Sequence, residues 1–364
     1  MDKATILIPD ISGFTEFLSQ TEIEHSTHII NELLEIIIAE DQLDFFLSEI
    51  EGDAVLFYRK GEPPTTEALI EQCLRMFTAF HHQLKIIARD TVCQCGACQM
   101  THGLNLKFII HSGQLFEYKI NRFVKASGID MIIAHRLLKN QVPGDEYILM
   151  SDKLGKEAGI QAQTVNLTWH EAEDRYASIG VVPYHYANLK AIREAVPPPP
   201  VRDNPALEQI RPDDRTLSIK VNAPMKHVYQ TLVNVEKRVL WVNGMKKVDW
   251  QPSTERLGTK HVCFTNGLRL EHTIIKTEFE ANEIKYYEKV RFLELLTEVM
   301  NLYQVKNLGE QESEISLTIK MQKSYLIPRF IFNTMVKGIK NDLDNLKTLC
   351  ENELRQGVSL SAVK

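Results

Sequence analysis

The sequence predicts an α+β protein of two domains, an α/β sandwich followed by an antiparallel sheet with a long C-terminal helix. Three observations carry this prediction. The chain has 364 residues, which is more than one ordinary domain. Strand-like and helix-like patterns alternate through the first half. A proline-rich stretch then separates a second half, in which several strand patterns precede one amphipathic segment.

The first half begins with the apolar run 6–8, which is too short for a helix and fits a buried strand. Apolar residues at helical spacing follow over 14–18 and 21–39. Two strand-like runs within 45–58 meet at a Gly-Asp turn and predict a hairpin, and a helix is expected over 65–88 after two prolines. The later predicted elements are strands over 104–111, 114–119 and 147–150 and a helix over 128–140.

Residues 194–213 differ in composition from the rest of the chain, with four consecutive prolines at 197–200. Stacked prolines favour extended polyproline geometry and cannot continue a helix or a sheet. We therefore expect domains over 1–193 and 214–364, joined by a semi-rigid linker over 194–213.

The second half opens with strict alternation over 217–221, a pattern typical of a half-buried strand. Ala223-Pro224 then begins a helix, because proline is well tolerated in a first turn. A long amphipathic helix is predicted over 325–354. The strands expected between the two helices lie over 260–264, 270–280, 285–290, 299–306 and 315–321.

Composition excludes several classes of function. A net charge of −6, without a long segment rich in Lys and Arg, argues against a nucleic-acid partner. No apolar run approaches the roughly 18–20 residues that a membrane span requires. The N-terminus has no apolar signal-peptide core, so a cytoplasmic location is expected. Six cysteines in a chain of this length do not form a disulfide scaffold.

Two aspartates stand at the ends of predicted strands. Asp10 ends the first strand and precedes a small polar turn with Ser12, Gly13 and Thr15, while Asp53 lies in the hairpin turn. Carboxylates beside free backbone N–H groups provide what a metal–phosphate ligand needs. The alternative is purely structural: Asp10 caps a helix and Asp53 is a turn residue.

Four blocks of the sequence, in the expected order over about residues 1–190, together resemble the class III nucleotidyl cyclases. The resemblance implies a cyclase-like sandwich with a ferredoxin-like core. It also implies a homodimer, because the family's site lies between two such domains and this chain contains one. The blocks are Asp10-Ile11-Ser12-Gly13-Phe14-Thr15, Gly52-Asp53, His111-Ser112-Gly113, and Gly128 with the helix through Arg136.

The resemblance also implies roles for single residues. Asp10, Asp53 and the carbonyl of Ile11 would bind two Mg²⁺ or Mn²⁺ ions, which activate a ribose hydroxyl and hold the triphosphate. The turn residues 12–15 would bind the nucleotide. Arg136 would stabilise charge on the phosphoryl group, or it is an ordinary exposed helix arginine. The implied activity is formation of a cyclic 3′,5′-nucleotide from a nucleoside triphosphate, ATP or GTP.

The sequence departs from the family at two places. Ile132 replaces the expected asparagine, and losing one such donor costs about 10²–10³ in rate. Glu49 stands at a base-selecting position and favours guanine, but Lys125 at the partner position matches neither nucleotide. Two functions therefore remain open: a weakened cyclase, or a nucleotide sensor without turnover.

Three thiols and one imidazole gather within ten residues, as Cys93, Cys95, Cys98 and His102. Three Cys and one His form a known structural set for Zn²⁺. The alternative is a loop of reduced thiols. The cyclase resemblance does not account for this segment.

The second half resembles the helix-grip architecture of the START-like, polyketide-cyclase-like superfamily. Trp241, Trp250 and the Gly258-Thr259 turn occupy places where such proteins often carry a tryptophan and a Gly-Thr turn. The resemblance implies a cavity for an apolar small molecule or a lipid. The following aromatic residues either line that cavity or form plain core: Trp241, Tyr286, Tyr287, Phe292, Tyr303, Phe330 and Phe332.

Overall fold

The computed structural model describes residues 2–19, 23–93, 96–121, 123–154, 167–200, 215–250, 256–265, 267–294, 297–323 and 329–357. The chain forms two compact units. The first comprises residues 1–89 and 96–200, and the second comprises residues 90–95 and 201–364. The short segment 90–95 therefore belongs to the second unit, although it lies deep in the first half of the sequence.

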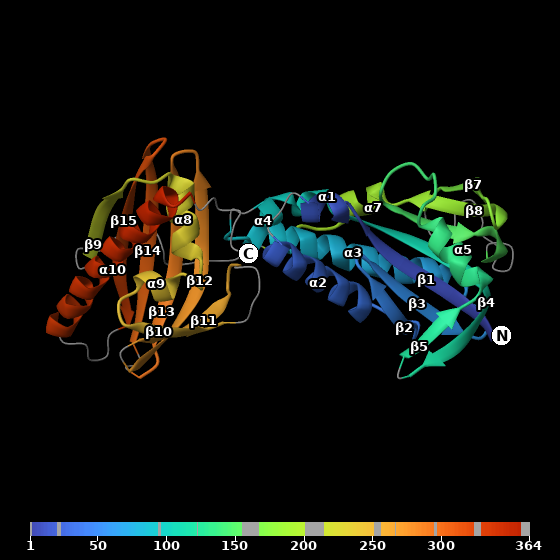
Figure 1. The fold of residues 1–364 in the computed structure, drawn as a ribbon, viewed down its shortest axis with the longest axis horizontal. Coiled ribbons are helices and arrows are strands. Elements are labelled where there is room, and N and C mark those ends of the chain that lie inside the picture. The colour runs from blue at the N-terminus through green and yellow to red at the C-terminus, as the bar shows by residue number, and fades with distance from the viewer. Residues whose placement is uncertain are drawn as a thin grey trace. The chain divides into compact units, whose positions relative to one another are not determined.

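The first unit is built on a ferredoxin-like core (Figure 1). Its four strands lie in the order β2-β3-β1-β4, and each neighbouring pair is antiparallel. Two helical crossovers connect them, so the chain follows the β-α-β-β-α-β pattern of that fold. The elements are β1 (Asp2–Ser12), α1 (Phe14–Ser19), α2 (Ile23–Ala39), β2 (Phe46–Glu51), β3 (Ala54–Lys60), α3 (Thr66–Asp90) and β4 (Asn105–Ile120).

The sheet continues beyond β4 through β6, β8 and β7, with β4 and β6 parallel. The two strands expected over 104–111 and 114–119 form one strand, β4, of 16 residues. Its last residues, 116–120, leave the main sheet and pair with β5. The remaining elements are α4 (Gly96–Met100), a 3₁₀ turn (Thr101–Gly103), β5 (Phe123–Ser127), α5 (Ile129–Leu137), β6 (Tyr147–Ser151), β7 (Trp169–Tyr176), β8 (Gly180–Asn188) and α7 (Lys190–Ala195).

This sheet buries side chains on both of its faces. Successive side chains of β1 and β3 point to opposite faces, and nearly all of them are buried. Ile6 and Ile8 pack with Met131 and Leu137 of α5 on one face. The alternate residues, such as Leu7, are equally buried on the face that α2 contacts through β3.

The second unit is an all-antiparallel sheet of seven strands in the order β10-β11-β12-β13-β14-β15-β9, followed by a C-terminal helix (Figure 1). Six of these strands occur where the sequence predicts strands and β10 was not predicted, and the fold class predicted from the sequence is confirmed. The elements are β9 (Arg215–Val221), α8 (Met225–Val233), α9 (Arg238–Trp241), β10 (Met245–Asp249), β11 (Lys260–Thr265), β12 (Leu268–Glu280), β13 (Glu283–Phe292), β14 (Thr297–Gly309), β15 (Glu312–Lys323) and α10 (Arg329–Arg355).

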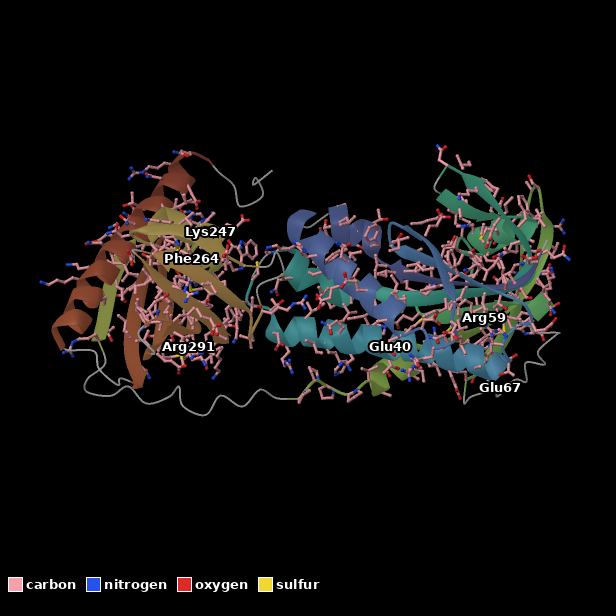
Figure 2. All side chains as sticks on the ribbon, turned by 90° about the horizontal axis from the view of Figure 1, so that it is seen from below. Glu40, Arg59, Glu67, Lys247, Phe264 and Arg291 are labelled. Atoms are coloured by element: carbon pink, nitrogen blue, oxygen red, sulfur yellow. The ribbon has the colours of Figure 1, made fainter. Side chains whose placement is uncertain are left out.

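The core of the second unit lies between the sheet and its helices. Leu343, Leu346 and Cys350 of α10 are buried against apolar side chains of β9, β13, β14 and β15. At the edge formed by β10 and β11, Lys247 Nζ lies 5.8 Å from the centre of the Phe264 ring (Figure 2). Such an exposed cation–π contact stabilises by about 0.5–1 kcal/mol and covers apolar area at this edge.

Two segments near the unit boundary have defined places. The backbone carbonyl of Val92 accepts a hydrogen bond from Tyr229 Oη at 2.7 Å, which fixes the segment 90–95 to the second unit. The proline stretch ends against α3, where Arg89 Nη1 donates to the carbonyl of Pro200 at 2.5 Å. Within the described ranges of the chain, no helix combines the length and apolarity needed to cross a membrane.

Candidate functional site

Asp10 and Asp53 lie side by side at one end of the first sheet. Asp10 is opposite Ala54 across the β1–β3 pair, and the Ile11 backbone N–H donates to the Asp53 carbonyl at 3.0 Å. Burial raises the pKa of the Asp53 carboxyl, and the nearby Asp10 carboxylate raises it further. The two carboxylates are therefore close enough to repel each other, as ligands of a shared cation are.

An internal ammonium group already neutralises one of them. Lys107 of β4 lies opposite Asp10 in the β1–β4 pair, and its Nζ is 2.9 Å from Asp10 Oδ2. Both side chains are largely buried. Burial alone would lower the pKa of Lys107, but the Asp10 carboxylate outweighs burial and the net shift is upward. The sequence offered no reason to pair these residues, since strand register decides it.

The donor set determines which cations fit. Mg²⁺ and Mn²⁺ prefer carboxylate and carbonyl oxygens, which Asp10 and Asp53 supply. One oxygen of Asp10 is occupied by the Lys107 ammonium, so the pair fits one divalent ion beside Lys107. Ile11, the third candidate ligand, is fully buried.

The turn after Asp10 approaches two other segments closely. Gly13 has φ of +85°, and a Cβ there would lie 2.6 Å from the Gly103 carbonyl oxygen, so only glycine fits without a shift. Phe14 lies beside the hairpin turn, 3.9 Å from where a Cβ on Gly52 would be. Ser12 Oγ is buried without a hydrogen-bond partner among the described residues. Thr15 is exposed.

Glu49 and Lys125, the positions at which the cyclase resemblance implies base selection, contact each other. Lys125 Nζ of β5 is 3.2 Å from Glu49 Oε2 of β2, which joins these strands across the surface of the unit. The carboxylate of Glu49 raises the pKa of Lys125. One oxygen of Glu49 is thus engaged by a cation.

Arg136 and Ile132 lie one turn apart on the exposed face of α5. Half of the Ile132 side chain is accessible, so an asparagine there would be solvated rather than buried. Large apolar side chains are also exposed on β2, β4, β5 and α5 of this unit. These side chains are Phe46, Leu47, Ile50, Phe116, Tyr118, Ile120, Val124, Ile129 and Ile132.

The third and fourth cyclase-like blocks meet in a buried cluster. His111 Nε2 is 3.0 Å from Asp130 Oδ1, and the Gln114 backbone N–H donates to Asp130 Oδ2 at 2.7 Å. Burial alone would raise the pKa of Asp130, but bonds from His111, Gln114 and Lys153 hold it well below its usual range. A Cβ on Gly113 would lie 2.0 Å from Asp130 Cγ. In the His-x-Gly pattern, His111 therefore bonds to Asp130 and Gly113 leaves space for its side chain at the start of α5.

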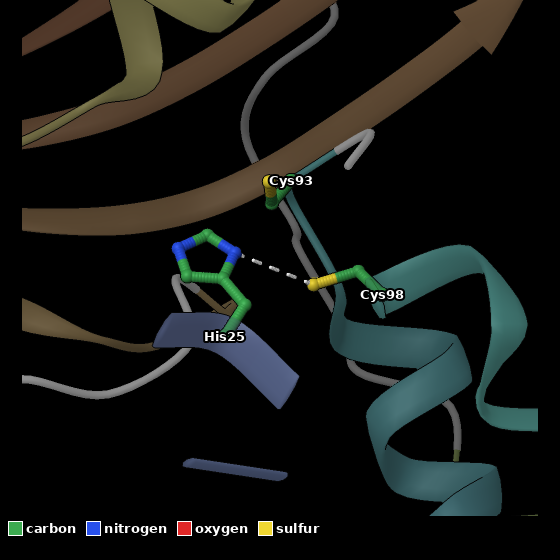
Figure 3. Close-up of side chains that lie close together, drawn as sticks. All are labelled: His25, Cys93 and Cys98. Atoms are coloured by element: carbon green, nitrogen blue, oxygen red, sulfur yellow. Dashed lines mark hydrogen bonds between the residues drawn. The ribbon is translucent and has the colours of Figure 1, made fainter. Parts of the chain in front are cut away.

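One thiol of the cysteine segment lies beside a histidine from another helix. Cys98 lies in α4 and its Sγ is 4.0 Å from His25 Nδ1 of α2 (Figure 3). His102 is exposed, and its Nδ1 is 2.9 Å from the Gln99 carbonyl oxygen. Cys93, also drawn in Figure 3, belongs to the segment 90–95 of the second unit. Cys95 lies outside the described residues, so the four-ligand zinc set remains a prediction.

The second unit contains a charged network that the sequence did not reveal. Arg238 of α9 is fully buried, and its Nη2 is 2.6 Å from Glu288 Oε2 of β13, whose side chain is also inaccessible. Glu288 also accepts bonds from Tyr286 Oη and Asn301 Nδ2, each at 3.3 Å. Burial alone would lower the pKa of His272, but Glu288 raises it to about 9.

A cavity of about 270 Å³ lies beside this network in the second unit. Arg238, His272 and Asn301 provide its polar end, and burial raises the pKa of Asp342 on α10 to about 6. Of the aromatic candidates whose side chains the structure describes, Trp241, Phe292 and Tyr303 line it, whereas Tyr287 packs in another cluster; Phe330 and Phe332 lie outside the described side chains. The apolar lining includes Trp241, Val290, Phe292, Val299, Tyr303, Leu317, Ile319 and Ile339.

Comparison with known proteins gives partial matches. Residues 30–147 match the family DUF2652, described as a protein of unknown function. Over 145 residues the chain is 32% identical to the uncharacterized protein Rv2561/Rv2562 of Mycobacterium tuberculosis. This match covers 39% of the chain and 66% of that relative, slightly less than two thirds of its length.

The first unit is similar in structure to nucleotidyl cyclase domains. The guanylate cyclase domain of RhGC from Catenaria anguillulae, in complex with GTP, matches at 15% identity with a TM-score of 0.37. That match covers 51% of this chain and 96% of the other. The adenylyl cyclase CyaB from P. aeruginosa matches at 18% identity and the same TM-score, over 51% and 93% of the two chains.

Sequence reasoning missed the network because its members are far apart in the chain. Arg238, His272 and Glu288 come from a helix and two strands, and no short motif joins them. The available signal was alternation: His261 and Cys263 occupy positions two apart on a predicted strand, where inward residues are usually aliphatic. Polar residues at such positions indicate either a satisfied network or a ligand site.

Proposed function

We propose that the first unit binds a nucleoside triphosphate together with one divalent cation, at the end of the sheet where Asp10 and Asp53 meet, and acts as a sensor rather than as a vigorous cyclase. The observation that carries this proposal is the adjacency of the two carboxylates, with the Lys107 ammonium against Asp10. A carboxylate pair attracts a hard cation, and the cation would bring the phosphates. The turn 12–15 provides backbone N–H groups for the phosphate oxygens.

Three observations favour binding over turnover. The Lys107 ammonium contacts the Asp10 oxygen that a second ion would use, and the Lys125 ammonium contacts the Glu49 carboxylate. The side chain of Ile132 has no group that can form a hydrogen bond. Electrostatic groups aimed at developing charge are usually the largest contribution to catalysis, so their loss weakens the chemical step more than binding. Cyclisation to a 3′,5′-nucleotide remains the alternative function of the same site.

Pairing of two copies fits the exposed side of this unit. Arg136 is exposed on α5, which also exposes Ile129 and Ile132, and a second copy seated there would bury these apolar side chains. Contiguous exposed apolar area commonly marks an interaction site. A homodimer would bring Arg136 of one copy towards the nucleotide of the other.

The first prediction concerns cation-dependent binding. A fluorescent GTP or ATP analogue should bind the full chain at least about tenfold more tightly with Mn²⁺ than with EDTA. Asp53→Ala should abolish that difference, because one carboxylate beside Lys107 leaves almost no negative charge for the cation. Asp2→Ala, an exposed aspartate at the other end of β1, serves as the control and should bind like the wild type.

Equal binding with Mn²⁺ and with EDTA in all three proteins would refute a cation-dependent site. The same samples, assayed for cyclic nucleotide, separate the two functions: tight binding without product supports the sensor, and steady product supports the cyclase. Ile132→Asn adds the missing donor at an exposed position, so it should not destabilise the fold. A rise in product with this variant would favour a weakened enzyme.

A second candidate function belongs to the second unit, and the cavity is the observation that favours it. We propose that the cavity binds an apolar molecule with one polar end, because an aliphatic and aromatic lining meets Arg238, His272 and Asn301 at one side. Binding pockets typically combine apolar walls with few convergent polar groups. The resemblance to START-like proteins points in the same direction.

The second prediction tests this cavity with 8-anilinonaphthalene-1-sulfonate, an apolar anion. The folded chain should bind about one equivalent with increased fluorescence, and Ile339→Trp should weaken binding at least about tenfold by filling the cavity. The neighbouring Lys340 is exposed, so Lys340→Trp should leave binding of the dye unchanged. Unchanged binding in the Ile339 variant would show that the dye binds elsewhere.

A further inference from the structure

Three buried side chains of the second unit gather on one face of its sheet, and neither proposed function uses two of them. His261 and Cys263 are two residues apart on β11, so both point to the same face. His272 lies directly opposite His261 on β12. One ligand atom from each residue lies within 4.8 Å of the others. The cluster therefore has the spacing of donors around one ion.

The hydrogen bonding of this cluster is incomplete. Neither ring nitrogen of His261 has a partner among the described residues, and the same holds for His272 Nε2. The two rings stack in parallel, with centres 4.9 Å apart and 10° between their planes. Burying a polar nitrogen without a partner costs about 1–3 kcal/mol, so several such atoms in one place require an explanation. A ligand that bonds to these nitrogens supplies one.

The buried charged network fixes the His272 ring through its Nδ1 atom. Its Nδ1 is 3.3 Å from Glu288 Oε1, within the buried network that fixes the carboxylate. Arg238 Nη1 also lies 3.0 Å from Nδ1 and a guanidinium can only donate, so Nδ1 accepts this bond and Nε2 is the nitrogen left for an ion, whose binding would release the Nε2 proton to solvent. A carboxylate behind the ligating imidazole is the usual outer partner in such centres.

The chemistry of the donors restricts the ion. One thiolate and two imidazoles suit a borderline-soft transition ion, whereas Mg²⁺ and Ca²⁺ take oxygen ligands. Cys263 is a buried free cysteine, and its Cα partners across the sheet are Val248 and Leu270, so no cysteine is paired with it. The candidate is therefore chemically distinct from the Asp10–Asp53 site.

We propose that His261, Cys263 and His272 bind one Zn²⁺-like transition-metal ion in the second unit. A metal–sulfur bond replaces the S–H bond of Cys263, and the proton leaves to solvent. Three protein ligands leave the fourth position of a tetrahedral ion for water or a small ligand, as in catalytic zinc sites. His272 also lines the cavity, so the ion lies next to it.

The test uses the full chain with Cys93, Cys95 and Cys98 changed to Ser, so that the other cysteine segment cannot bind metal. After chelation and dialysis, this protein is titrated with Co²⁺, whose bond to a thiolate gives an intense near-ultraviolet absorption. We expect one equivalent of Co²⁺ to produce this band and Zn²⁺ to displace it. Cys263→Ser should remove the band, whereas Cys350→Ser, a buried cysteine of the same unit, should retain it.

A second variant keeps the test decisive if Cys263→Ser unfolds. His261→Asn leaves the thiolate in place and should weaken Co²⁺ binding at least about tenfold, because one of three ligands is lost. The folded fraction is followed by far-ultraviolet circular dichroism. Absence of a Co²⁺–thiolate band in the folded parent, or an identical band in the Cys263 variant, would overturn the proposal.

Discussion

Glu288→Gln should destabilise the second unit by about 3–5 kcal/mol, because it leaves a buried guanidinium without its counter-charge. Arg238 and Glu288 are inaccessible to solvent, and their closest atoms are 2.6 Å apart. Glutamine has nearly the same shape as glutamate, so the loss of stability reports the missing charge and not a change in side-chain volume. Urea unfolding followed by tryptophan fluorescence measures it, in a Trp169→Phe background in which only Trp241 and Trp250 of the second unit report.

An exposed ion pair of the same unit provides the control. Arg269 and Glu294 are 2.7 Å apart but largely solvated, so Glu294→Gln should cost at most about 1 kcal/mol. Changing both buried partners, as Arg238→Met with Glu288→Leu, should recover much of the loss because no charge stays unpaired. Equal costs for the Glu288 and Glu294 variants would contradict a buried, uncompensated charge.

Gly113→Ala should destabilise the first unit by about 2–4 kcal/mol, because the added Cβ would lie 2.0 Å from Asp130 Cγ. Asp130 must then leave His111 and the Gln114 N–H, and a buried histidine nitrogen loses its partner. The wild-type contribution of Asp130 also predicts a pH dependence. Since its folded pKa is depressed, this stability is present above the unfolded value near ~4 and is lost as the pH falls below it.

The difference between the wild type and Gly113→Ala should therefore be full at neutral pH and shrink on acidification below about pH 4. Gly103→Ala is the matched control, since its Cβ meets nothing within 4 Å. A double variant isolates the clash: with Asp130→Ala present, Gly113→Ala should add little. A large additional cost in the double variant would show that Gly113 is needed for another reason. Unfolding is followed here in a Trp241→Phe, Trp250→Phe background, which leaves Trp169 of the first unit.

The sequence by itself determined the kind and order of the elements. Apolar period and turn residues predicted the α+β class, the strand before Asp10, the hairpin at Asp53 and the amphipathic C-terminal helix. These features are local, since the apolar pattern that predicts a strand or a helix extends over only a few neighbouring residues. Adjacency of Asp10 and Asp53 also followed, because residues at neighbouring strand ends meet at one edge of the sheet.

The local sequence pattern predicted the structure less well where a strand changes partners. It divided β4 in two, because nothing in the apolar pattern shows that one strand leaves the main sheet for β5. It also offered no sign that the segment 90–95 joins the second unit, since that placement depends on bonds such as Tyr229 to Val92.

Only the tertiary structure decided which charged groups meet. Strand register places Lys107 against Asp10, and packing of α9 on the sheet places Arg238 against Glu288. The same folding brings His261, Cys263 and His272 onto one face. A pairing between residues 97 or 50 positions apart leaves no periodic trace in the sequence, because its energy depends on burial and on distances of a few ångströms.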